Sequence, residues 1–87
     1  MSASAPKSLN DSVRTLIATV LGLNLDQVPA EAMAGEFAPW TSLAHIEIMM
    51  GLEAQFDVSA PSHRLMDLMS VELIADFLRE KGVKESD

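Results

Sequence analysis

The serine at position 42 is the residue of this chain best placed to take part in chemistry. It lies in the run WTSLAH, residues 40–45, at the start of a stretch with helical spacing and after a long segment that contains glycine and proline. A serine at such a position either caps the helix or stands exposed enough for an enzyme to modify it. Because serine caps are common, position alone favours the cap.

The other reactive groups near Ser42 do not complete a catalytic set. His45 follows three positions later on the same predicted helix, and no acid is evident to orient it, whereas a hydrolytic triad needs three convergent side chains. We expect His45 to be exposed or half-buried and His63 to lie at the surface. Two distant histidines without a third ligand do not form a metal site. The sequence therefore indicates a protein that is not an enzyme, with a small hydrolase as the least favoured alternative.

Length and charge narrow the classes of partner. The chain has 87 residues, which form one domain with a thin core. Its net charge of −7, from 13 acidic and 6 basic residues, argues against nucleic acid and anionic membranes and favours basic protein surfaces. No cysteine is present, which excludes a disulfide, a thiolate metal site and a cysteine nucleophile. With no signal peptide and no apolar run approaching ~20 residues, we expect a cytoplasmic monomer that does not insert into membranes.

The apolar spacing predicts an all-α fold, a small bundle of three longer helices and one short helix. Serine or threonine precedes each predicted helix as an N-cap. The caps, in chain order, are Ser8, Thr41, Ser62 and Ser70. Gly22 and Gly82 are expected to stop the first and last helices. The second helix covers residues 42–56 and the short helix covers residues 63–67.

A long loop, residues 22–41, separates the first two predicted helices. Loops of this length, about 20 residues, are often functional in compact domains. We expect one helical turn over residues 29–33, begun by Pro29, and we expect Trp40 to anchor the loop. The chain thus divides into a disordered arm at residues 1–7, a helical domain at residues 8–82 and a polar tail at residues 83–87.

The second predicted helix carries two stripes of residues at helical spacing. The stripe expected to face the core consists of Ile46, Met49, Leu52 and Phe56. Leu43, Glu47 and Met50 lie on a different stripe, and an exposed methionine there suits a surface that meets several partners. Met66 and Met69 are expected in or near the core.

The stretch from Ser42 onward resembles the acyl carrier protein family. The hallmark of that family is Asp-Ser-Leu at the start of its second helix, which here reads Thr41-Ser42-Leu43. Residues 42–58 follow the family's pattern of apolar positions and contain its Glu-x-x-Phe-acidic ending. The order of helices also agrees, so that the resemblance covers residues 8–81.

The resemblance implies that Ser42 accepts 4'-phosphopantetheine from coenzyme A through a phosphodiester bond made by a phosphopantetheinyl transferase. The thiol of that arm then carries an acyl group as a thioester, and a helix N-terminus suits the phosphate charge. The implied partners also include an acyl- or aminoacyl-loading ligase and acyl-transferring enzymes. By register with the family, the partner-contacting positions are Leu43, Glu47, Met50 and Glu53. The candidates for lining a cargo cleft among the helices are Ile46, Met49, Leu52, Ile74 and Leu78.

Three residues set this chain apart from the abundant members of the family. Thr41 stands where the family has aspartate; it can cap the helix but offers no carboxylate to a transferase. Ala54 replaces a glutamate that is common in the family. A tryptophan before the hallmark, here Trp40, is similar to what carriers of specialised pathways have at this position. The resemblance therefore implies a specialised carrier rather than one of primary fatty acid synthesis. Two alternatives stay open. One is an aminoacyl or peptidyl carrier, although the Gly-Gly-x-Ser motif is absent, and the other is a carrier-like interaction module that is never modified.

Overall fold

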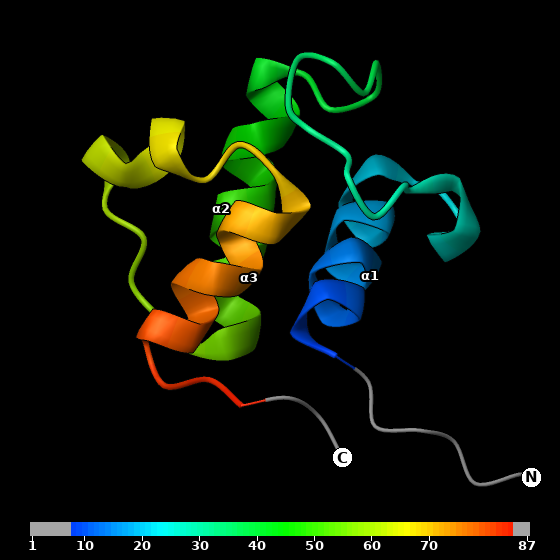
Figure 1. Cartoon of the computed structure of the whole chain (residues 1–87). Coiled ribbons are helices and arrows are strands. Elements are labelled where there is room, and N and C mark those ends of the chain that lie inside the picture. Colours follow the sequence, from blue (N-terminus) through cyan, green and yellow to red (C-terminus); the bar gives the residue numbers. More distant parts are fainter. Residues whose placement is uncertain (1–7, 85–87) are drawn as a thin grey trace, which may run out of the picture.

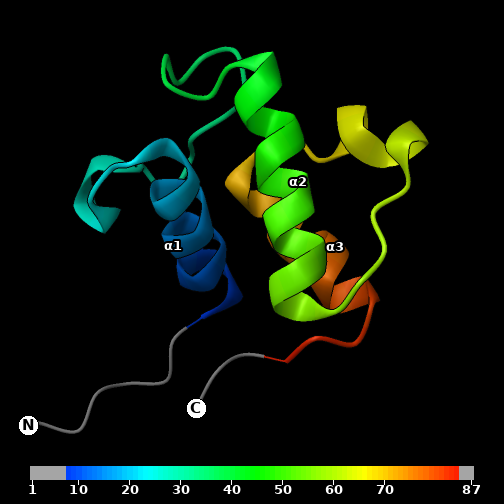
Figure 2. The ribbon, with the colours of Figure 1, turned by 180° about the vertical axis from the view of Figure 1, so that it is seen from behind.

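The computed structural model describes residues 8–84, so the expected arm and the last three residues of the expected tail lie outside the described range. Within these residues there are three α-helices: α1 (Leu9–Leu21), α2 (Ser42–Phe56) and α3 (Val71–Glu80). Two short 3-10 helices, η1 (Leu25–Gln27) and η2 (Ser62–Asp67), lie in the connections. Figures 1 and 2 show the three α-helices side by side, with η2 beside α2 and α3. The predicted all-α bundle of three longer helices and one short helix before α3 is confirmed.

Hydroxyl caps begin each α-helix, as predicted. Each side-chain oxygen accepts a hydrogen bond from the backbone N–H three residues later, at distances of 3.1, 3.2 and 3.1 Å. The three caps are Ser8, Thr41 and Ser70. Gly22 ends α1 with a left-handed backbone (φ 72°). The predicted cap at Ser62 is wrong, because Pro61 occupies the cap position of η2 and no side chain caps that helix.

One hydrophobic core is shared by the three α-helices. Its largest fully buried side chains are Trp40, Phe77, Leu9, Ile17, Ile48, Leu52, Leu68, Ile74 and Leu78. The close approach of α1 and α2 occurs at Gly51, where a Cβ atom would lie only 3.0 Å from Cδ1 of Leu16. A side chain at Gly51 would therefore have to displace the end of the Leu16 side chain of α1. Within residues 8–84, no helix is long and apolar enough to cross a bilayer.

The face that α2 turns toward the core differs from the prediction. Ile48 is completely buried, whereas Ile46 is 48% exposed and Phe56 is only half-buried. Met49 and Leu52 are buried as expected. The error has a simple cause: α2 carries large apolar residues on both its buried and its exposed sides, so spacing alone could not tell which set faces inward.

Side chains of α1 hold the first half of the long loop. The Nε atom of Arg14 donates to the carbonyl of Val28 at 2.8 Å, and its Nη2 atom donates to the carbonyl of Leu25 at 3.2 Å. Val28 itself is completely buried. These contacts favour a helical turn at η1. The predicted helical turn over residues 29–33 is wrong, because a non-helical turn forms there instead.

The second half of the loop is tied to the start of α3. The N–H of Ala34 donates to the carbonyl of Met69 at 2.7 Å, and the N–H of Val71 donates to the carbonyl of Ala32 at 3.2 Å. Trp40, at the end of the loop, is completely buried, as predicted for an anchor. The loop is therefore held against the body of the protein just before α2 begins.

The 3-10 helix η2 packs on α3 through Arg64. The guanidinium carbon of Arg64 lies 5.2 Å from the centre of the Phe77 ring, and one nitrogen lies 3.8 Å from a carboxylate oxygen of Glu80. A cation above an aromatic face is attractive. A second contact comes from α2, where the side chain of His45 is hydrogen-bonded to the carbonyl of Leu65. The two contacts together position η2 opposite the loop.

Candidate attachment site at Ser42

Ser42 is the first residue of α2 and its side chain is exposed. The cap of α2 is made by the preceding residue, because Oγ1 of Thr41 accepts the N–H of Ala44 at 3.2 Å. The first turn of α2 contains no acidic residue, and the backbone N–H groups of a helix N-terminus favour a negatively charged substituent. Of the two roles considered for Ser42, capping therefore falls to Thr41.

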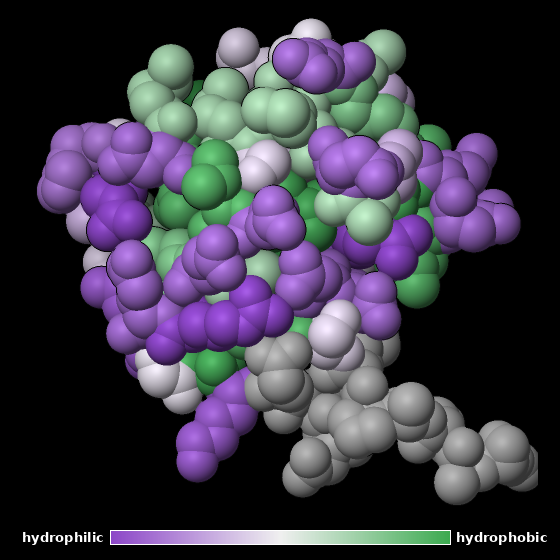
Figure 3. All heavy atoms as spheres, viewed as in Figure 1, coloured by the Kyte–Doolittle hydropathy of each residue, from purple (hydrophilic) through white to green (hydrophobic). Residues whose placement is uncertain are grey.

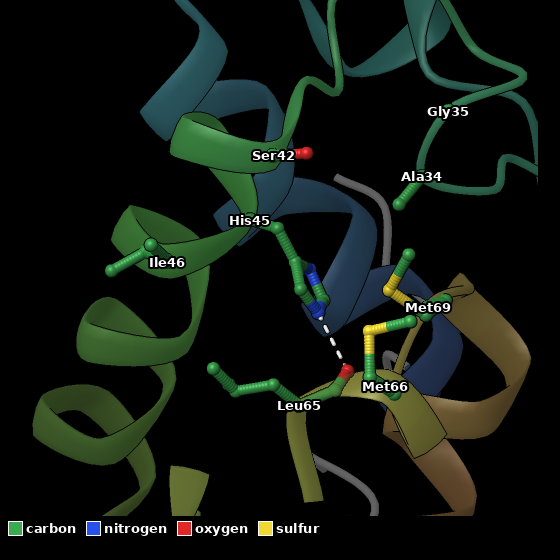
Figure 4. A pocket seen from close by; sticks show the side chains of 8 residues that line it. All are labelled: Ala34, Gly35, Ser42, His45, Ile46, Leu65, Met66 and Met69. Atoms are coloured by element: carbon green, nitrogen blue, oxygen red, sulfur yellow. Dashed lines mark hydrogen bonds between the residues drawn. The ribbon is translucent and has the colours of Figure 1, made fainter. Parts of the chain in front are cut away.

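An apolar pocket of about 240 Å³ opens beside Ser42. It lies between the long loop, the start of α2 and the η2 segment. Its lining residues are Ala34, Gly35, Ser42, His45, Ile46, Leu65, Met66 and Met69. Figure 4 shows the Ser42 hydroxyl pointing toward the wall formed by Ala34 and Gly35, with Met66 and Met69 on the η2 side. A group attached to Ser42 would thus leave the protein at the mouth of this pocket.

His45 lies under the pocket and is only 5% exposed. The indole Nε1–H of Trp40 donates to Nδ1 of His45 at 3.0 Å, and Nε2 of His45 lies 2.9 Å from the carbonyl oxygen of Leu65. Because an indole nitrogen can only donate, Nδ1 must accept, and Nε2 carries the hydrogen that is donated to Leu65. These two hydrogen bonds select the neutral Nε2–H tautomer, and Figure 4 shows the bond to Leu65.

The expectation that His45 would be exposed or half-buried is therefore wrong. The physical reason is that both ring nitrogens find partners, which removes most of the cost of burying them. His45 belongs to α2. Its side chain connects that helix to the end of the long loop, at Trp40, and to η2, at Leu65. His63 is exposed, as expected. Within the described part of the chain, no group of three histidine or acidic side chains could hold a metal ion.

The structure separates the five candidates for a cargo cleft into two groups. Ile46 lies on the wall of the pocket. The other four, Met49, Leu52, Ile74 and Leu78, are at most 3% exposed and lie in the closed core instead. In this structure these four side chains pack the helices against each other.

Three of the four partner-contact candidates lie on the exposed side of α2. Leu43 is 68% exposed, Met50 is 64% exposed, and Glu47 is also exposed. Glu53 differs, because it is half-buried and its Oε2 atom accepts the backbone N–H of Ala60 at 2.7 Å. Glu53 therefore holds the connection between α2 and η2, a role that the sequence did not reveal.

Several residues of the pocket were missed by sequence reasoning. Met66 was expected near the core but is 76% exposed, while Met69 is half-buried on the pocket wall. Ala34 and Gly35 come from the loop, and Leu65 comes from η2. No periodicity connects these segments. The one available signal was the pair of polar aromatic rings at positions 40 and 45, just before and one turn after Ser42.

Comparison with known proteins agrees with this geometry. The family described as "Phosphopantetheine attachment site" matches residues 11–78. An acyl carrier protein from Bdellovibrio bacteriovorus is 31% identical over 75 residues, covering 86% of this chain and 96% of the relative. Another from Akkermansia muciniphila is 30% identical over 73 residues, covering 84% and 91%. A third, from Chlorobium phaeovibrioides, is 29% identical over 73 residues, covering 84% and 94%.

The chain belongs to the acyl carrier protein family, whose members are carriers rather than enzymes and bear 4'-phosphopantetheine. The residues at the start of α2 fit that group. They provide an exposed serine hydroxyl, a helix N-terminus that favours the charge of a phosphodiester, and an apolar pocket beside that hydroxyl.

Proposed function

We propose that this protein carries an acyl group as a thioester on a 4'-phosphopantetheine arm attached to Oγ of Ser42, and delivers it to partner biosynthetic enzymes. The observation that carries this proposal is that two adjacent residues at the start of α2 have different roles. Thr41 caps the helix, and Ser42 stands exposed beside an apolar pocket. The attached group supplies the thiol that a chain without cysteine lacks.

The residues around Ser42 have distinct parts in this function. The backbone N–H groups of the first turn of α2 stabilise the negative phosphodiester. His45 keeps η2 in place and offers no free ring nitrogen, because both of its nitrogens are hydrogen-bonded. It therefore serves neither as a base nor as a ligand. Hydrolysis by a Ser42–His45 pair is disfavoured for the same reason.

The partner enzymes we propose are a phosphopantetheinyl transferase, an acyl-loading ligase and acyl-transferring enzymes. Leu43, Glu47 and Met50 form an exposed stripe on α2 that begins next to Ser42 and can meet these partners. The net charge of −7 steers the protein toward basic surfaces. Figure 3 shows apolar side chains gathered mainly toward the end of the molecule where α2 begins, with polar side chains over the opposite end of that face. We infer that docking combines apolar contact near Ser42 with electrostatic steering from the rest of the surface.

Two features favour a carrier of a specialised pathway, and we propose separately that the protein works in the cytoplasm. Thr41 and Ala54 replace acidic residues that the family usually has along α2. This leaves Glu47 as the exposed acid on the middle of that helix. A partner that recognises this helix must therefore depend less on ion pairs than a partner of a strongly acidic carrier.

The proposed function is tested by intact mass measurement after incubation with coenzyme A and a broad-specificity phosphopantetheinyl transferase, followed by fragment mapping. We expect the mass of one phosphopantetheine on Ser42. Ser42→Ala should show no gain and keep its helical circular dichroism, while Ser62→Ala, which changes another exposed serine, should load normally. Loading of Ser42→Ala would show that the attachment site is wrong.

The second candidate function is an unmodified helical module that binds a protein partner. Thr41 favours this alternative because it withholds the carboxylate of the family hallmark. Absence of any mass gain with several transferases, in a folded sample that binds a partner stably, would establish the module in place of the carrier.

A further inference from the structure

We propose that His45 makes the region around Ser42 sensitive to acid, because its imidazole cannot take up a second proton and keep its hydrogen bond from Trp40. Protonation releases the end of the long loop from α2, just before Ser42. This sensitivity belongs to the chain itself and does not depend on a group attached to Ser42. It follows from the direction of the Trp40 bond, the burial of both rings and the positions of the neighbouring charges.

The hydrogen bond between Trp40 and His45 has only one possible direction. The indole Nε1–H can donate but not accept, and its nitrogen lies 3.0 Å from Nδ1 of His45. Nδ1 must therefore keep its lone pair. A proton added to His45 goes to this same nitrogen, because Nε2 already carries the hydrogen that is donated to the carbonyl of Leu65 at 2.9 Å. Two N–H groups would then face each other, and the bond would be lost.

The two rings have no access to water that could replace this bond. Trp40 is completely buried, His45 is 5% exposed, and their ring centres lie 5.7 Å apart. A buried indole N–H without an acceptor costs free energy, and a buried imidazolium without a carboxylate partner costs more. Protonation of His45 is therefore coupled to movement of one ring away from the other.

The charged groups on the surrounding elements do not offset this cost. The exposed acids of those elements are Glu31 and Glu36 of the loop, Glu47 of α2, Asp67 of η2 and Glu72 of α3. Water screens their attraction for a buried cation. Glu53 accepts the N–H of Ala60 instead, and Arg64 of η2 is directed toward Phe77, while His63 is exposed. His45 also ends the first turn of α2, where the helix dipole disfavours a positive charge.

The segment that His45 holds leads directly into Ser42. The N–H of Trp40 donates to the carbonyl of Phe37 at 2.8 Å, and the carbonyl of Trp40 accepts the N–H of Gly35 at 3.1 Å. The end of the loop is thus folded around Trp40. Figure 4 shows the His45 ring between the turn that carries Ser42 and Leu65. Loss of the Trp40 bond loosens the loop wall beside Ser42, whereas Nε2 of His45 still donates to Leu65.

The test compares the parent protein with His45→Gln, in which residue 45 cannot titrate. This variant is matched, because its neutral amide has an acceptor for Trp40 and a donor for Leu65. Histidines of an unfolded chain take up a proton as the pH falls through about 6.5. If the folded protein excludes that proton, its unfolding constant rises by about thirtyfold between about pH 7.5 and about pH 5.

Urea unfolding at the two pH values measures this increase. We expect it in the parent protein over and above the change in His45→Gln. Acid also reduces repulsion among the carboxylates of a chain with a net charge of −7, and the comparison removes this shared effect. His63→Gln changes an exposed histidine and should keep the pH dependence of the parent.

NMR of the parent protein gives a second readout, which decides the question even where His45→Gln does not fold. Trp40 is the only tryptophan, so its indole N–H gives a single signal, and the ring nitrogen-15 signals of His45 report its protonation. During acidification, we expect an imidazolium signal of His45 only together with changes in the Trp40 indole signal and in the amide signals of Gly35 and Ser42.

Two results would overturn the proposal. One is an imidazolium signal of His45 with an unchanged Trp40 indole signal. The other is a pH dependence of unfolding that agrees within about threefold between the parent protein and His45→Gln. Loading of Ser42 from coenzyme A is measured separately, so failure of the acid-sensitive link and failure of the carrier function are distinguishable.

Discussion

Replacing His45 by phenylalanine should destabilise the protein strongly, although the ring is kept. The change removes both hydrogen bonds of the buried imidazole. Trp40 is completely buried, so its indole N–H would be left without an acceptor, at a cost of about 1–3 kcal/mol. The carbonyl of Leu65 keeps a second donor, the N–H of Leu68 at 3.2 Å, so the loss there is nearer to about 1 kcal/mol.

The two contributions together predict a decrease in the free energy of unfolding of about 2–4 kcal/mol. This is a large share of the stability of a domain this small, for which about 0.05–0.15 kcal/mol per residue is usual. The midpoint of thermal unfolding should decrease by roughly 8–32 °C, because 1 kcal/mol corresponds to about 4–8 °C in domains of 60–100 residues.

A double-mutant cycle separates the Trp40–His45 interaction from other effects of the substitutions. Urea unfolding followed by far-ultraviolet circular dichroism would be measured for His45→Phe, Trp40→Phe and the double variant. We expect the double variant to lose about 1–2 kcal/mol less than the sum of the single losses, because the second change removes the orphaned partner. His63→Phe, at an exposed position, should stay within about 0.5 kcal/mol of the parent protein. A loss below about 0.5 kcal/mol for His45→Phe, or strict additivity, would refute the reasoning.

Three further predictions concern α2. Thr41→Asp keeps the cap and restores the family's carboxylate, so transferase loading should be faster than in Thr41→Asn, which keeps the cap without the charge; equal rates in mass-monitored time courses would show that the carboxylate is not recognised. Glu53→Ala should cost about 1–2 kcal/mol in urea unfolding, because the N–H of Ala60 loses its acceptor, whereas the exposed Glu47→Ala should be nearly neutral; similar losses would count against this role for Glu53. Gly51→Val should lower the thermal midpoint by an amount equivalent to about 1–3 kcal/mol, because the new side chain overpacks against Leu16 of α1, and an unchanged midpoint would show that the Leu16 side chain moves aside without cost.

The helices could be located from the sequence because their ends depend on neighbouring residues. Ser8, Thr41 and Ser70 each bond to the backbone N–H three positions later, an interaction that needs no tertiary contact. Ser62 shows where this reasoning fails. Its helix is a short 3-10 segment preceded by Pro61, and the segment is positioned by Arg64 packed on Phe77 and by the bond from His45 to the Leu65 carbonyl.

The orientation of α2 lay beyond the reach of periodicity. Ile46 and Ile48 are chemically alike and two positions apart, yet one is 48% exposed and the other is completely buried. Met49 and Leu52 fit either stripe, since both have neighbours at three or four residues. The choice between the two faces depends on where α1 and α3 pack, including the close approach of α1 at Gly51.

By itself, then, the sequence determined the helical class, the caps of the three α-helices and the family, because these depend on local bonding and on a contiguous motif. Only the tertiary structure decided the pocket and the role of His45. The pocket walls come from residues 34–35 and 65–69, which are brought together by the bond from Ala34 to Met69. His45 became a buried link because Trp40 and Leu65 arrive on its two sides. Contacts between segments so distant in the chain follow from packing of the whole core and leave no periodic trace in the sequence.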